Sequence, residues 1–171
     1  MDNIILIGFM GAGKSTIGRK LARDGRFVFV DTDDKIEEEQ QEKISHIFET
    51  KGEAYFRDLE TQALKDLLSC KMRMVIAVGG GLPMREENRR LLKELGTVIY
   101  LKAEIDTLVS RLTGDTSRPK LRGGSLREKI ETLMQQREAI YLETADEEIF
   151  TDEKEPEKIA KEIKERFFPD L

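Results

Sequence analysis

The sequence has a single cysteine, no apolar run as long as a membrane span and no excess of positive charge. Cys70 alone cannot form an internal disulfide, which is typical of a reducing compartment, so we expect a cytoplasmic protein. The first residues, Met1 to Asn3, show no basic, apolar, cleavable leader. Lys and Arg total 29 against 34 Asp and Glu, and this formal charge of −5 argues against general binding to nucleic acid or to an anionic membrane.

The length of the chain suffices for one domain. A chain of 171 residues can bury a sizeable core without disulfides or metals, and a second independent domain would not fit. We therefore expect a single domain over residues 1–171. Charged residues make up 37% of the chain, but they are interleaved with apolar residues at regular spacing, which predicts a folded protein.

Short apolar runs alternate with segments of helical periodicity, a pattern typical of a parallel sheet covered by helices. Amphipathic helices are predicted over residues 53–69 and 159–167, where apolar residues recur every three or four positions. Ser125 is the expected N-cap of a helix to about Ala139, and Pro156 suits a first helical turn. Buried strands are predicted over residues 3–8, 27–30, 74–78 and 98–101.

One segment, residues 113–124, interrupts this pattern. It holds three glycines and a proline, and it has no periodicity. Such a composition is typical of a mobile loop. Its tip is positively charged, because it carries Arg118, Lys120 and Arg122.

The strongest motif is Gly8-Phe9-Met10-Gly11-Ala12-Gly13-Lys14-Ser15, which satisfies G-x-x-x-x-G-K-[ST] between a predicted strand and a helix expected over 15–23. Backbone N–H groups of such a loop converge on a β-phosphate, and the helix N-terminus adds its positive end. Lys14 can reach the β and γ oxygens, and Ser15 can ligate Mg²⁺. A plain glycine turn would not need Lys14 and Ser15 at these positions. The Asn-Lys-x-Asp guanine motif is absent, so the sequence predicts ATP binding rather than a GTPase.

Two acids follow the second predicted strand, whereas the strand over 74–78 runs into glycines. In a doubly wound sheet the ligand crevice lies at the carboxyl ends of the strands, so Asp31 and Asp33 are candidates for that crevice. One can serve the water shell of a metal and the other an acceptor hydroxyl. The alternative is a solvated acidic start to a helix over 32–40, favoured by the helix dipole.

Arg57 and the triple glycine 79–81 also carry two interpretations. Glu60, three residues after Arg57 on a helix, can brace its guanidinium for bidentate capture of a carboxylate, or the two can form an ordinary surface ion pair. The glycines can offer unhindered N–H groups and a close approach to a ligand, or form a loose turn. The entropic cost of three glycines favours the close approach.

In this order, the motifs resemble the shikimate kinase family from residue 4 to about 141. The P-loop is shared by a whole superfamily, whereas the ordered set is specific. The matching residues are Gly8 to Ser15 with Thr16-Ile17-Gly18-Arg19 following, Asp31-Thr32-Asp33, Ile47-Phe48 with Gly52-Glu53, Phe56-Arg57-x-x-Glu60, Gly79-Gly80-Gly81, Arg118-Pro119, and Arg137 followed by Tyr141.

The resemblance implies an α/β fold of the P-loop nucleoside-monophosphate-kinase type, a five-stranded parallel sheet flanked by helices. It implies a mobile lid at about 113–124 and an acceptor-binding region at about 32–60. The implied reaction moves the γ-phosphoryl group of ATP, with Mg²⁺, onto the 3-hydroxyl of shikimate, giving shikimate 3-phosphate and ADP for chorismate and aromatic amino acid biosynthesis. A monomer is expected.

The same resemblance assigns roles to individual residues. Catalysis falls to Lys14, Asp33 and Arg118, and the metal shell to Ser15 and Asp31. The nucleotide contacts are Gly11, Ala12, Gly13, Lys14, Ser15, Thr16, Arg111, Arg118 and Pro156. The shikimate contacts are Asp33, Arg57, Gly79, Gly80, Gly81 and Arg137.

Lys120 departs from the family pattern, since an apolar residue is common after Arg118-Pro119, and this leaves the packing of a closed lid open. Two other functions remain: a gluconate-type small-molecule kinase, and a non-catalytic nucleotide-binding module. The Phe-Arg-x-x-Glu and triple-glycine elements fit shikimate kinase better than gluconate kinase.

Overall fold

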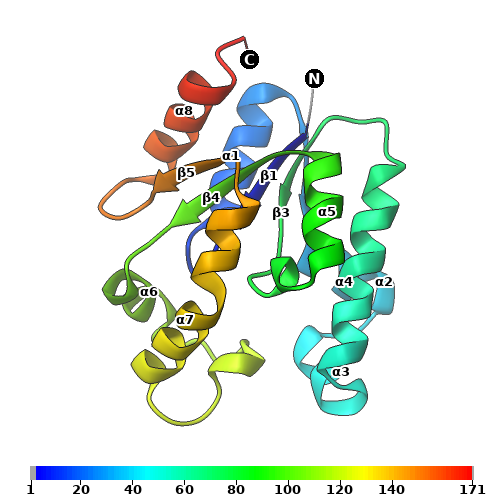
Figure 1. The fold of residues 1–171 in the computed structure, drawn as a ribbon, viewed down its shortest axis with the longest axis vertical. Helices are drawn as coiled ribbons and strands as arrows, with labels where there is room; N and C mark the ends of the chain where they lie inside the picture. Colours follow the sequence, from blue (N-terminus) through cyan, green and yellow to red (C-terminus); the bar gives the residue numbers. More distant parts are fainter. Residues whose placement is uncertain (1–2, 171) are drawn as a thin grey trace.

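The computed structural model describes residues 3–170, which form one five-stranded parallel sheet with helices on both faces (Figure 1). Met1 and Asp2, at the start of the segment considered for a leader, lie outside the described residues. The sheet order is β2-β3-β1-β4-β5, and every neighbouring pair is parallel. The predicted fold class is confirmed. The strands are β1 (Asn3–Ile7), β2 (Val28–Asp31), β3 (Met74–Ala77), β4 (Gly96–Lys102) and β5 (Glu147–Phe150).

Helices connect the strands and cover the sheet, α1 and α8 on one face and α4, α5 and α7 on the other (Figure 1). None of the helices within residues 3–170 is long and apolar enough to cross a membrane. The α-helices are α1 (Lys14–Gly25), α2 (Thr32–Gln40), α3 (Ile44–Lys51), α4 (Glu53–Leu68), α5 (Glu86–Leu95), α6 (Ile105–Leu112), α7 (Leu126–Thr144) and α8 (Pro156–Phe167), and the short 3-10 helices are η1 (Leu82–Met84) and η2 (Pro119–Leu121).

The two predicted helix starts near the C-terminus are confirmed. Ser125 caps α7, its Oγ accepting the N–H of Glu128, and Pro156 opens α8. However, α7 runs to Thr144, beyond the predicted end near Ala139, because Tyr141 and Thr144 continue its buried face.

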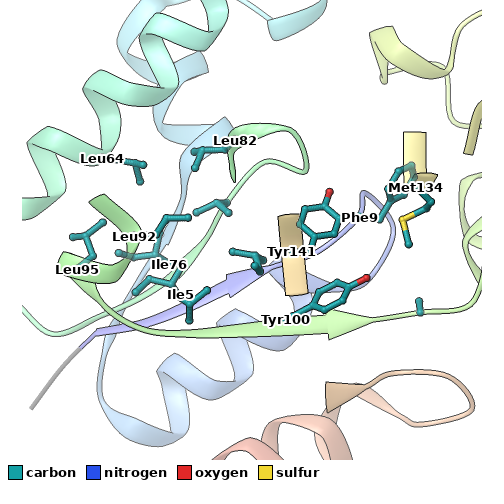
Figure 2. Packing of buried hydrophobic residues seen from close by; sticks show 14 of the residues in the cluster. Ile5, Phe9, Leu64, Ile76, Leu82, Leu92, Leu95, Tyr100, Met134 and Tyr141 are labelled. Atoms are coloured by element: carbon teal, nitrogen blue, oxygen red, sulfur yellow. The ribbon is translucent and has the colours of Figure 1, made fainter. Parts of the chain in front are cut away.

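The central strands are apolar throughout because both of their faces are buried. Ile5 and Ile76 point toward Leu92 and Leu95 of α5 in the core shown in Figure 2. The alternate residues of the same strands, such as Ile4 and Leu6, pack against α1 and α8. Each fully buried aliphatic side chain stabilises the fold by about 1.5–3 kcal/mol.

A third, smaller cluster lies away from the sheet. Ile36 of α2, Ile47 of α3, and Phe56 and Ala63 of α4 are buried against one another. This cluster attaches α2 and α3 to the first half of α4. It holds Arg57, one residue after Phe56, at a defined place beside the carboxyl ends of the strands.

Candidate active site

One cavity of about 890 Å³ lies at the carboxyl ends of β1, β2 and β3. Because parallel strands end at the same edge, the loops that follow them meet there. All of the residues predicted to contact nucleotide, acceptor or metal line this cavity: Gly11, Ala12, Gly13, Lys14, Ser15, Thr16, Asp31, Asp33, Arg57, Gly79, Gly80, Gly81, Arg111, Arg118, Arg137 and Pro156.

The P-loop forms the floor of the cavity between β1 and α1. Gly11 and Gly13 have φ values of 82° and 94°, which L side chains rarely adopt, so glycine is required there. Gly13 is the N-cap of α1 and provides no side-chain cap, and the first turn of α1 holds no acid. The first N–H groups of α1 therefore remain available to an anion, which the helix dipole favours.

Lys14 lies half-buried over this loop. Its Nζ donates to the carbonyl oxygens of Gly8 at 2.7 Å and Phe9 at 2.9 Å. Burial lowers the pKa of Lys14 to about 7, although nearby Asp33 acts in the opposite direction. A bound polyphosphate would favour the charged ammonium again.

Ser15 and Asp31 bring two oxygen ligands together next to the P-loop. Ser15 Oγ donates to Asp31 Oδ2, while Asp31 Oδ1 accepts the N–H groups of Asp33 at 2.9 Å and Asp34 at 3.2 Å. Asp31 is thus the N-cap of α2, as the alternative interpretation of this acidic segment held. Its other oxygen nevertheless faces the P-loop serine, so the cap also positions an acid at the phosphate site.

Asp33 lies in the cavity on the first turn of α2. Burial, and then the negative charge of Asp31, raise the pKa of Asp33 to about 6. The positive charges of Lys14, Arg118 and Arg57 oppose this rise. The Asp33 carboxylate is therefore close enough to the P-loop lysine and to both arginines for their charges to affect its pKa.

Arg57 projects from α4 and is held by two acids. Its Nη1 donates to Glu60 Oε1 at 2.5 Å, and its Nη2 donates to Glu53 at 3.3 Å. Glu60 is fully buried, and burial raises its pKa to about 7 against the charge of Arg57. The alternative of an ordinary surface ion pair is therefore wrong, because one partner is inaccessible to solvent.

Charged side chains pack directly against the backbone of the triple glycine after β3. A Cβ at Gly79 would lie 2.8 Å from Asp33 Oδ1, and one at Gly80 would lie 3.2 Å from Arg137 Nη1. A Cβ at Gly81 would lie 2.4 Å from Arg57 Nη2. The close approach to a ligand that the sequence favours stays a prediction, and the close approach in the structure is made by the protein's own side chains.

One expectation for these glycines needs correction. The N–H of Gly79 is not free for a ligand, since it donates to Thr32 Oγ1 at 3.1 Å. Thr32 is fully buried between Asp31 and Asp33, so this bond ties the end of β2 to the loop after β3. Glycine is needed at position 79 for space rather than for a ligand contact of its N–H.

The clash at Gly81 leads to a prediction. Gly81→Ala should raise KM for the acceptor about tenfold while leaving KM for ATP nearly unchanged, because the new methyl group displaces the Arg57 guanidinium but lies outside the P-loop. Initial-rate kinetics with each substrate varied in turn would measure both constants. Equal KM values for wild type and variant would contradict the close packing of Gly81 and Arg57.

Arg137 and Tyr141 line up on one face of α7. Arg137 is only 4% exposed, and its Nη1 has no hydrogen-bond partner among residues 3–170. Tyr141 is fully buried and donates from its hydroxyl to the Gly80 carbonyl at 2.5 Å. Tyr141 therefore holds the glycine loop in place beside Arg137, a positioning role that its place in the sequence motif alone did not reveal.

Arg118, Arg111 and Pro156, the residues predicted to contact the nucleotide outside the P-loop, also line the cavity. Arg118 is on the segment between α6 and α7, and its charge lowers the pKa of both Lys14 and Asp33. Arg111 Nη1 donates to the Gly11 carbonyl at 3.0 Å. Pro156 is far from the two arginines in sequence, and the fold brings it to the same cavity.

The geometry as a whole defines a class of protein: a P-loop kinase that phosphorylates a small anionic molecule. A phosphate cradle, a buried acid and two arginines open into a single cavity, with room for a nucleotide and a small acceptor.

Comparison with known proteins identifies the family. The profile described as shikimate kinase matches residues 10–167. Shikimate kinase of Persephonella marina is 46% identical over 163 residues, which cover 95% of this chain and 97% of the relative. A solved structure of shikimate kinase from Acinetobacter baumannii in complex with shikimate has 35% identity and a TM-score of 0.95, covering 99% of this chain and 94% of that one. The chain belongs to the shikimate kinase family.

A gluconokinase structure from Sinorhizobium meliloti has a TM-score of 0.55 at 15% identity, covering 94% of this chain and 88% of that one. At this identity the likeness shows the fold alone.

Proposed function

We propose that the protein transfers the γ-phosphoryl group of ATP to the 3-hydroxyl of shikimate, giving shikimate 3-phosphate and ADP. The observation that carries the proposal is the convergence of Asp33, Arg57 and Arg137 with Lys14 in one cavity. Shikimate carries one carboxylate and several hydroxyls, which match two arginines and one acid. Membership of the family supports the same reaction.

Each residue has a defined part in this proposal. Arg57 and Arg137 bind the shikimate carboxylate by charge-assisted hydrogen bonds, and Asp33 orients the attacking hydroxyl and receives its proton. The transition state is loose, with charge spread over the phosphoryl oxygens, so catalysis depends on alignment and charge neutralisation. Lys14 and Arg118 supply positive charge to those oxygens.

The nucleotide contacts follow from the cavity lining. The backbone of Gly11 to Thr16 would cradle the phosphates, and Arg111 and Pro156 would lie against the adenine. Gly80 and Gly81 would contribute backbone donors near shikimate.

Mg²⁺ fits the oxygen atoms that this site offers. Ser15 Oγ and Asp31 Oδ2 are adjacent, and Mg²⁺ is usually held by one or two carboxylates together with phosphates and waters. Ser15 would ligate the ion and Asp31 would order its waters. The ion would neutralise charge on the β and γ oxygens.

The proposal also covers the regions of the chain and the setting in which the protein acts. The segment at about 113–124 would act as the lid and the region at about 32–60 as the acceptor-binding part of a single domain. The protein would act as a monomer in the cytoplasm, without nucleic acid or membrane as a partner.

A coupled ADP-release assay with purified protein tests the function. ATP plus shikimate should give rapid ADP release, whereas ATP plus gluconate should stay at the background rate. A higher kcat/KM for gluconate would replace the proposal with a gluconate-type kinase. ATP binding without stimulation by any hydroxy acid would indicate a non-catalytic module.

The raised pKa of Asp33 predicts the pH dependence of the reaction. With ATP saturating, kcat/KM for shikimate should rise with pH through about 6 and then level, because a protonated Asp33 cannot accept the hydroxyl proton. No fall near pH 7 is expected from Lys14, since the charges of bound ATP keep it protonated. Initial rates measured between about pH 5 and 8, the range in which Asp33 titrates, would give the profile.

Glu60→Gln distinguishes Asp33 from the other buried acid in the site. The pKa of Glu60 is raised to about 7, so Glu60 is the other group whose protonation can lower kcat/KM at acidic pH. If Asp33 controls the profile, kcat/KM for shikimate in this variant still rises with pH through about 6. Loss of that rise in Glu60→Gln would mean that Glu60, and not Asp33, controls the pH dependence.

A further inference from the structure

The segment between α6 and α7 contacts the acceptor side of the cavity through two ion pairs. Lys120 Nζ lies 2.7 Å from Glu53 Oε2 on α4, and Arg122 Nη1 lies 2.7 Å from Glu49 Oε1 on α3. All four side chains are at least 36% exposed. The two pairs therefore have similar geometry and exposure, but they differ in the further contacts of their acids.

Glu53 also contacts Arg57. The other carboxylate oxygen of Glu53 accepts from Arg57 Nη2 at 3.3 Å, while Glu60 holds Arg57 Nη1. Lys120, Glu53, Arg57 and Glu60 thus form a row of alternating charges from the lid to the buried acid. Glu49 has no such link to Arg57 among the described ion pairs.

Glu53 competes with the acceptor for Arg57. A guanidinium grips a carboxylate with two N–H groups at once, and Glu53 occupies Nη2, one of the nitrogens available for that grip. A cation beside Glu53 attracts the Glu53 carboxylate, so the attraction between Glu53 and Arg57 is weaker and Glu53 competes less well with the acceptor. Lys120 is such a cation, and it also lines the cavity.

We propose that Lys120 is a positioning residue that strengthens acceptor binding by engaging Glu53 and so weakening the hold of Glu53 on Arg57 Nη2, which the acceptor carboxylate can then take. The proposal rests on the proposed function, because it takes a carboxylate acceptor as given. It assigns a use to the residue at which this sequence departs from the family pattern, where an apolar side chain could pack but could not engage Glu53.

The charge of Glu53 responds to both cations. Burial alone would raise the pKa of Glu53, but the hydrogen bond and charge of Lys120, together with Arg57, hold that pKa below its usual range. The Glu53 carboxylate therefore stays ionised at neutral pH, so it remains available to Lys120 over the working range of the assay.

Lys120→Gln tests the proposal in the full-length protein. KM for shikimate should rise about three- to fivefold, the upper part of the range that an exposed ion pair supports, with kcat and KM for ATP nearly unchanged. Lys120→Arg should keep the wild-type KM. The rise should vanish when Lys120→Gln is made in a Glu53→Gln background, because the competing charge is then gone.

Arg122→Gln is the matched control. It removes the other ion pair of the lid and leaves Glu53 and Arg57 in place, so KM for shikimate should stay within about 1.5-fold of wild type. An equal rise in Arg122→Gln, or a rise in Lys120→Gln that persists without Glu53, would overturn the proposal in favour of a simple lid contact. An unchanged KM in Lys120→Gln would overturn it as well.

The wild-type rates separate this proposal from the function itself. If the wild type releases ADP with shikimate but Lys120→Gln behaves identically, only the role of Lys120 falls. If the wild type shows no shikimate-dependent ADP release, the proposed function falls and the role of Lys120 with it.

Discussion

Lys14→Met should lower kcat by about 10³-fold, with the fold intact. Lys14 is the cation that the P-loop motif assigns to the β and γ oxygens, and its Nζ already lies against the P-loop carbonyls of Gly8 and Phe9. Methionine keeps the length of the side chain and removes the charge. The loss should appear in kcat more than in KM for ATP, because the charge on the phosphoryl oxygens matters most in the transition state.

Thermal unfolding of the same variant checks that the loss is chemical. The folded pKa of Lys14 is lowered to about 7, so the folded state disfavours the ammonium relative to the unfolded chain. This penalty is complete below about pH 7 and fades as pH rises toward the unfolded pKa. Lys14→Met should therefore unfold at the same or a higher temperature than wild type at pH 7. A kcat within tenfold of wild type would contradict the role of Lys14.

The phosphate site could be predicted from sequence because its geometry is local. The spacing of glycines, Lys14 and Ser15 determines the turn between β1 and α1, and these residues lie where the motif requires. The place of Asp33 followed less directly, from the rule that the ligand crevice lies at the carboxyl ends of parallel strands. The place of Arg57 in the same site was implied by the family resemblance, because Arg57 lies within α4 and not in a loop after a strand.

Other features depend on contacts that no local pattern records. The fifth strand, β5, reads Glu-Glu-Ile-Phe and buries only Ile149, since it is an edge strand paired with β4 alone. It therefore shows no apolar run, and only the family resemblance predicted it. The row from Lys120 to Glu53 joins segments that are distant in sequence, so nothing near either residue indicated it.

At the triple glycine the structure shows a close approach of a different kind from the predicted approach to a ligand. Chain entropy indicated that the glycines at 79–81 serve a close approach. The partners that approach are Asp33, Arg137 and Arg57, because the site packs its own charged groups against the glycine backbone. Composition favoured the close approach but did not identify which atoms make it.

Asp33→Asn should lower kcat by about 10²–10⁴-fold, the range for loss of a positioned general base. Asparagine preserves size and hydrogen bonding but cannot accept the hydroxyl proton at neutral pH. In the wild type a pKa of about 6 leaves Asp33 largely ionised at pH 7, yet more basic than an ordinary aspartate. Shikimate affinity, measured by titration calorimetry, should change much less than kcat, because Arg57 and Arg137 still bind the carboxylate.

Asp34→Asn provides the matched control for this variant. Asp34 is the next residue on the first turn of α2, its side chain is 63% exposed, and it pairs with Arg19 at 3.5 Å. Removing its charge alters the same acidic segment without touching the carboxylate that feels Lys14, Arg118 and Arg57. A kcat within about threefold of wild type is therefore expected for Asp34→Asn, as for a surface substitution. Similar losses in the two variants would mean that the segment acts through its overall negative charge, and the role of Asp33 as the acceptor of the proton would be lost.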